Sequence, residues 1–203
     1  MRSGPARGPR SRSGALVSRF SIGCAACTVS GMHRSLLDDA FGHHVWATTR
    51  LIDACLPLSP DELARAVPGT FGSILDTLRH VVGSDCSYLW LLTDGTAPAI
   101  DDASLDLPGL RAAMAANGPA WAALLSQPLD PDRIVVRHRD DGSEAHAPLG
   151  FRIAQVLHHG TDHRSQVCTA LTALGIEPPE IDVWAYAVSQ DRFRETPPTT
   201  PLT

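Results

Sequence analysis

The chain has 203 residues, 43% of them hydrophobic, and this length favours one domain with a single core. It contains no lysine, and six of its 17 arginines precede Asp38, so residues from 35 onward carry 11 arginines and 22 acidic side chains, a net charge of −11. This acidic body disfavours binding to nucleic acids and membrane surfaces, and its apolar runs are shorter than the ~20 residues of a membrane helix.

The two ends of the chain differ in composition from its middle. Residues 1–31 are rich in Arg, Ser and Gly without any acidic residue, which predicts a disordered or non-native leader. We expect one domain over residues 32–195 and a disordered Pro- and Thr-rich tail at 196–203.

The odd number of five cysteines shows no disulfide pattern, so a cytoplasmic location is expected. The Cys24-x-x-Cys27 pair lacks the two further ligands of a structural zinc site.

Two long helices are predicted in the first half of the domain. Apolar residues recur at intervals of three and four over residues 36–56, which predicts a helix that Pro57 ends. A short helical turn is expected at 59–62. An S-x-x-D capping pattern then begins a second helix that is predicted over residues 73–93.

His80 lies off the apolar stripe of this second helix. Its helical neighbours are nearly all small, namely Ser73, Asp76, Thr77, Gly83, Ser84 and Ser87. Such a face is typical of an exposed polar surface. Alternatively, the small side chains leave an open cavity above a ligand histidine.

A third helix and a hairpin follow. Asp106 and Pro108 predict the start of a helix over residues 110–126, with a kink or break at Asn117-Gly118-Pro119. Asp140-Asp141-Gly142 then separates two short extended runs, which is typical of a β-hairpin over residues 133–148.

The last long helix is predicted over residues 150–174, with Gly175 at its carboxyl end. A short helix at 181–187 is expected to cover part of the bundle through Trp184 and Tyr186.

The last long helix carries a motif for metal binding. His159 and His163 are four residues apart, so both imidazoles share one helix face and can bind one ion. Of the nine histidines, no other two are three or four residues apart. Gly160 stands where a zinc-protease helix carries glutamate, which argues against a metalloprotease. The spacing alone fits two solvated surface histidines equally well, although His163 falls within the apolar stripe.

Three segments together resemble one known family. They are Thr77-Leu-Arg-His80-Val81, the run H-G-T-D-H-R-S-Q ending at Gln166, and L-G-I-E-P-P after it, with supporting aromatics at Phe41 and Trp46. These residues resemble the DinB/YfiT-like superfamily over about residues 36–190. The family motif usually has the form H-x-x-x-H-R-G-Q, so Ser165 departs from it, and we expect little effect because Ser is also small.

The resemblance implies a fold and a metal site. The implied fold is all-α, a four-helix bundle with a small β-hairpin before the last long helix. A divalent metal, zinc or nickel, would be bound by His80, His159 and His163, and three imidazoles leave a position for water or substrate. The resemblance also implies a homodimer.

Further residues near the motif are candidates for roles at this site. Asp76, Asp162 and Gln166 could each orient a ligand imidazole by accepting its second N–H. Arg164 could bind an anionic group of a substrate, and a salt bridge to an acidic neighbour is the alternative.

The function implied by the resemblance is a metal-dependent thiol S-transferase acting on a small-molecule substrate. The Ala- and Arg-rich composition is typical of a high-GC genome, for which mycothiol is the expected low-molecular-weight thiol. A metal-dependent hydrolase and a non-catalytic metal- or ligand-binding stress protein are the alternatives. Hydrolysis is disfavoured because no Asp or Glu general base is evident beside the histidine pair.

Overall fold

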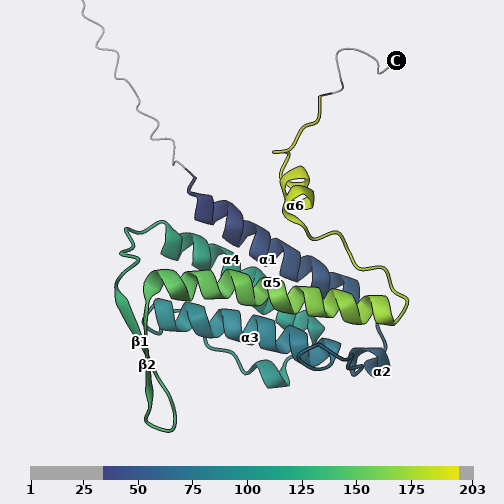
Figure 1. The fold of residues 1–203 in the computed structure, drawn as a ribbon, viewed down its shortest axis with the longest axis horizontal. Helices are drawn as coiled ribbons and strands as arrows, with labels where there is room; N and C mark the ends of the chain where they lie inside the picture. Colours follow the sequence, from purple (N-terminus) through teal and green to yellow (C-terminus); the bar gives the residue numbers. More distant parts are fainter. Residues whose placement is uncertain (1–33, 197–203) are drawn as a thin grey trace, which may run out of the picture. The chain divides into compact units, whose positions relative to one another are not determined.

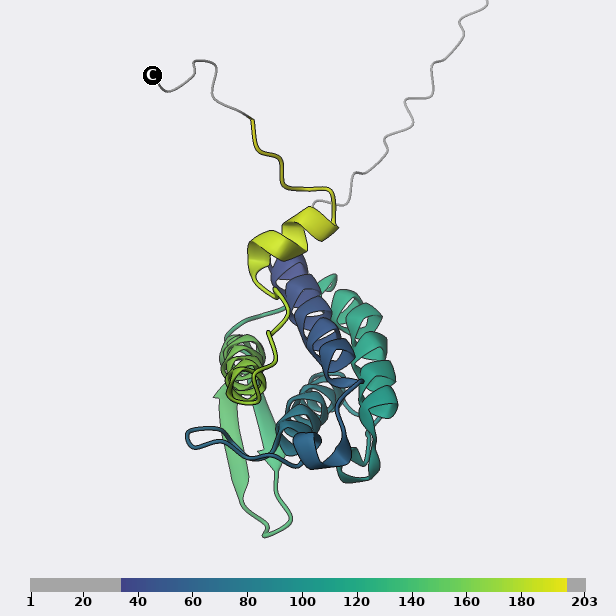
Figure 2. The ribbon, with the colours of Figure 1, turned by 90° about the vertical axis from the view of Figure 1, so that its right-hand side faces the viewer.

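In the computed structural model, residues 34–196 are described; the predicted leader at 1–31 and the tail beyond residue 196 lie outside them. Four long helices dominate this part of the chain: α1 (Leu36–Cys55), α3 (Ile74–Leu92), α4 (Leu107–Leu125) and α5 (Leu149–Ala173). They pack in a ring in which α1 contacts α4, α4 contacts α3, α3 contacts α5 and α5 contacts α1 (Figure 1). Figure 2 looks nearly along α5, drawn in green, and shows α1 and α4 obliquely beside it. The predicted helical bundle is confirmed.

Side-chain caps fix where the long helices begin. Ser73 Oγ accepts the Asp76 N–H at 3.1 Å, as the S-x-x-D pattern predicts. The Asp106 carboxylate accepts the Gly109 N–H at 2.9 Å, so α4 begins at Leu107, earlier than predicted.

Helix α4 continues through Pro119, so the predicted break at this position is wrong. Proline lacks the N–H that would bond to the carbonyl four residues earlier. However, both flanks of Pro119 are held by one buried carboxylate: Asn117 Nδ2 donates to Asp85 at 2.6 Å, and Trp121 Nε1 donates to it at 3.1 Å. These long-range contacts explain why the local helix-breaking signal does not prevail.

The predicted hairpin is confirmed. Strands β1 (Ile134–His138) and β2 (Glu144–Pro148) pair antiparallel, with Val136 opposite His146. Gly142 in the turn has φ of 81°, a conformation that favours glycine. Buried Arg152 of α5 donates to the carbonyls of Val135 and Ala145, which fixes the hairpin to the bundle.

Short elements connect and cover the bundle: α2 (Pro60–Leu63), the 3-10 helix η1 (Asp102–Ser104) and α6 (Val183–Ser189). Gly175 has φ of 76° after the end of α5, as predicted for the carboxyl cap. Tyr186 of α6 is buried against α1, where its hydroxyl lies over Gly42. Trp184 is 66% exposed, so the expectation that it covers the bundle is wrong; it packs on Phe193 instead.

The core has two apolar clusters, one around Leu51, Leu78 and Met114 and the other around Phe41 and Trp121. Each long helix also buries at least one polar side chain that belongs to neither cluster, and among these are His44, Thr48, Asp85, Asn117 and Arg164. Within residues 34–196, no helix combines the length and apolar character needed to cross a membrane.

Candidate metal centre

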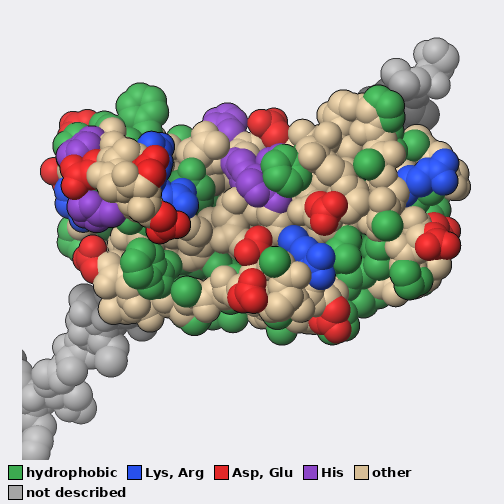
Figure 3. Space-filling view, turned by 90° about the horizontal axis from the view of Figure 1, so that it is seen from below, with side chains coloured by type: hydrophobic (Ala, Val, Ile, Leu, Met, Phe, Trp, Pro, Cys, Tyr) green, Lys and Arg blue, Asp and Glu red, His purple; other side chains and the backbone are tan. Residues whose placement is uncertain are grey.

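Three histidines from two helices converge on one point. His80 of α3 and His159 and His163 of α5 each offer a ring nitrogen, and these nitrogens all lie within 4.8 Å of one another. The Nε2 atoms of His80 and His159 are only 2.9 Å apart. Histidine side chains gather at the surface near the middle of one face (Figure 3), apart from the charged end of the molecule. The packing of α3 on α5 therefore brings together the three histidines that the resemblance implied as ligands.

Gln166 orients one of these imidazoles. Its Oε1 lies 3.0 Å from His163 Nδ1 and also accepts the backbone N–H of Phe71 at 2.9 Å. Because the oxygen can only accept, His163 Nδ1 carries the proton and Nε2 keeps its lone pair for a ligand. A fixed tautomer with a free Nε2 is the state that metal binding requires.

Phe71 covers the histidine cluster, and sequence analysis did not find it. Its ring stacks on His80 with centroids 4.1 Å apart and contacts His163 edge-on at 5.2 Å. It comes from the loop before α3, where no periodic pattern marks a residue as a contact. Phe71 as a residue is 54% exposed, so part of it remains accessible to a bound molecule.

Burial favours the neutral form of two of these imidazoles, those of His80 and His159. Burial and, next, the neighbouring His163 lower the pKa of His159 to about 4. Burial and His163 also lower the pKa of His80 below its ordinary value. Neutral imidazoles from both residues are therefore available near pH 7, and this donor set fits a divalent metal such as zinc or nickel.

An open cavity of about 390 Å³ adjoins the cluster. Beside His80 and His159, its lining includes Gly83, Ser84, Ser87 and Tyr88. Three of the small neighbours of His80, namely Gly83, Ser84 and Ser87, thus border open space, in line with the second interpretation of that helix face. Ser73 and Thr77 are buried instead.

Two charged side chains enter this cavity from other parts of the chain. Asp102 of η1 packs its carboxylate over Gly83, and Arg137 comes from strand β1. Sequence analysis missed both, because only the tertiary fold brings the loop and the hairpin next to α3. The structure thus adds a carboxylate, that of Asp102, to the lining of the cavity beside His80 and His159, which the sequence did not indicate.

The other candidates from the sequence lie elsewhere. The Asp76 carboxylate accepts one hydrogen bond, from the hydroxyl of Ser73, the residue that caps α3. Asp162 is exposed and makes no hydrogen bond with a histidine of the described chain. Arg164 is 4% exposed and points away from the cluster, where it donates to His44 and Thr48.

Arg164 belongs to a buried hydrogen-bond network through the bundle. Its Nη1 donates to His44 Nδ1 at 3.0 Å, so the proton of His44 is on Nε2, which donates to Asp85 at 3.0 Å. Burial lowers the pKa of Arg164 to about 10. The one sequence signal for this network is Asp85 itself, a charged residue within the apolar stripe of α3.

Gly160 allows this network to form. A Cβ there would collide with the His44 ring and lie 2.9 Å from Arg164 Nη1. The glycine that separates this motif from a zinc-protease helix therefore has a packing role.

The fold and the histidine cluster together define a helical bundle with a candidate metal centre between two of its long helices. The chain matches the DinB family over residues 32–198, and it belongs to that family. No match to it is found among curated proteins.

Proposed function

We propose that this chain is a metal-dependent thiol S-transferase whose metal ligands are His80, His159 and His163. The observation that supports this most is the convergence of three imidazoles beside a cavity of about 390 Å³. When bound, zinc or nickel supplies a positive charge that lowers the pKa of a thiol.

The residues around the cavity have complementary tasks in this proposal. Gln166 holds His163 in the tautomer that leaves Nε2 free, and Phe71 limits water access from one side. Ser84, Ser87 and Arg137 offer hydrogen bonds to the polar part of a low-molecular-weight thiol such as mycothiol. The sulfur forms a C–S bond to the electrophile, the leaving group departs with its electron pair, and the thiol proton passes to solvent.

A metal-dependent hydrolase is the second candidate, and Asp102 favours it. Hydrolysis needs a base that accepts a proton from water, and this carboxylate lines the same cavity as His80 and His159.

The test is the reaction of thiols with an electrophile in the presence of the full chain loaded with zinc or nickel. We expect faster consumption of mycothiol, or of another small thiol, with monochlorobimane as electrophile. His159→Ala should abolish the acceleration, whereas His158→Ala should retain it because His158 is exposed. Asp102→Asn should leave thiol transfer largely intact.

No acceleration with any thiol tested would contradict the transferase proposal. Metal-dependent ester hydrolysis that Asp102→Asn abolishes would favour the hydrolase instead.

A further inference from the structure

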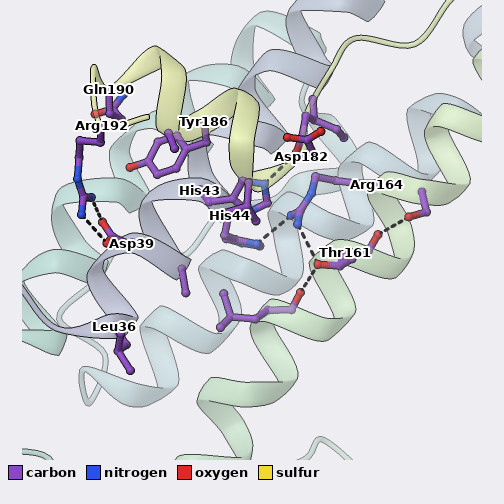
Figure 4. A pocket seen from close by; sticks show the side chains of 16 residues that line it. Leu36, Asp39, His43, His44, Thr161, Arg164, Asp182, Tyr186, Gln190 and Arg192 are labelled. Carbon is purple, nitrogen blue, oxygen red and sulfur yellow. Dashed lines mark hydrogen bonds and ion pairs between the residues drawn. The ribbon is translucent and has the colours of Figure 1, made fainter. Parts of the chain in front are cut away.

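A second cavity, of about 730 Å³, lies between α1, α5 and residues 181–192 (Figure 4). On α5 its lining includes Leu157, Thr161 and Ser165, which are spaced by four residues and share one face. His159 and His163 project from roughly the opposite face of the same helix. The two cavities have no lining residue in common, so this one is distinct from the candidate metal centre.

Most of the exposed surface of the lining is apolar, and Leu36, Ala40, Ile181, Tyr186 and Ala187 are among the residues that contribute to it. Ligand pockets in proteins typically have volumes of about 300–1,000 Å³ and combine apolar walls with a few polar groups. This cavity has the size and the walls to bury the body of an apolar small molecule.

Arg164 supplies a positive charge at this cavity. The side chain is 4% exposed and, among its five N–H groups, three donate to His44, Thr48 and Thr161. Nε and the second hydrogen of Nη2 make no hydrogen bond within residues 34–196. No carboxylate of the described chain forms an ion pair with Arg164; Asp85 lies on the far side of His44.

The acidic groups that line the cavity are already engaged. Asp39 pairs with Arg192 and also accepts from Arg34 at 2.7 Å, as Figure 4 shows for the Arg192 pair. The Asp182 carboxylate caps α6 by accepting the Ala185 N–H at 2.7 Å. Within residues 34–196, no carboxylate that lines the cavity therefore forms an ion pair with Arg164.

We propose that this cavity binds a small amphipathic carboxylate, with its apolar body against α1 and α6 and its carboxylate on the free N–H groups of Arg164. A guanidinium presents parallel donors that match the two oxygens of a carboxylate, and such charge-assisted bonds are stronger than neutral ones. The proposal does not rest on thiol transfer.

The experiment measures binding of decanoate, with 1-decanol as the uncharged control, to the full chain by calorimetry. We expect one decanoate per chain and weaker binding of decanol. The affinity should be the same in metal-loaded and chelator-treated protein, since the cavity is separate from the histidines. Arg164→Gln should weaken decanoate binding at least tenfold and leave decanol unaffected.

A second pair of variants does not depend on the buried arginine. Ala187→Trp fills the cavity and should weaken decanoate binding at least tenfold, whereas Val188→Trp, next to it on α6 but outside the lining, should not. Equal affinities for these two variants, equal affinities for acid and alcohol, or no decanoate binding would each overturn the proposal. Binding that disappears when metal is removed would assign the acid to the histidine cluster and overturn it as well.

Discussion

At Gly160, the backbone of α5 lies against the buried ring of His44 with no room for a side chain. Gly160→Ala should therefore lower the free energy of unfolding by about 1–3 kcal/mol, the usual cost of overpacking a core. Urea denaturation of the full chain measures this change.

Gly118→Ala is the matched control for that prediction, because its Cβ would meet only Val45 Cγ1 at an ordinary 3.6 Å. This change should be neutral or stabilise the helix by up to about 1 kcal/mol. If both variants have the same stability, the close packing of His44 on Gly160 is contradicted.

Individual residues of the site could be predicted from the sequence to different extents. His159 and His163 were found by their spacing, because a helix makes residues four apart neighbours. The small neighbours of His80 left two interpretations open, and the family resemblance then assigned it to the metal site. Phe71, Asp102 and the His44–Asp85 pair were missed, since each reaches its partner through contacts between segments far apart in the chain.

At the scale of the helices, α4 contains a proline that tertiary contacts override. Pro119 is exposed and lacks one helical hydrogen bond. Pro119→Ala should restore the bond and raise the free energy of unfolding by about 1–2 kcal/mol, after allowance for the greater freedom of the unfolded chain.

Pro108→Ala, in the first turn of the same helix, should not stabilise the protein, since an N–H in that turn has no helical partner. Thermal or urea unfolding compares the two variants. A loss of stability in Pro119→Ala would show that the proline is favourable where it stands and contradict this account.

The helices themselves were well predicted from local sequence, because apolar periodicity and capping residues act within a few positions. The α3 cap at Ser73 and the hairpin turn at Gly142 are examples. The break expected in α4 was wrong because Asp85, a residue of another helix, holds both flanks of Pro119. Trp184 was misassigned because a seven-residue helix has too little pattern to show which face is buried.

At the scale of the whole bundle, Asp85 connects all four long helices. It accepts from His44 of α1 and from Asn117 and Trp121 of α4, and His44 in turn accepts from Arg164 of α5. Asp85→Asn places an N–H against these buried donors, so the free energy of unfolding should fall by about 3 kcal/mol.

Asp53→Asn is the control, because Asp53 also links two helices, through Arg111, but at an exposed position. Loss of this exposed ion pair should lower the free energy of unfolding by less than about 1 kcal/mol. Chemical denaturation of both variants tests the comparison, and equal effects would contradict a central role for the buried network.

Metal content is the measurement that tests the central claim most directly. The full chain, purified without an affinity tag, is compared with His80→Ala, His159→Ala and His163→Ala, and with His158→Ala as an exposed control. We predict about one zinc or nickel per chain in the wild type and in the control, and loss of the metal in each of the other three variants. A wild-type protein that contains no metal, and whose melting temperature does not change when zinc or nickel is added, would contradict the three-histidine metal centre.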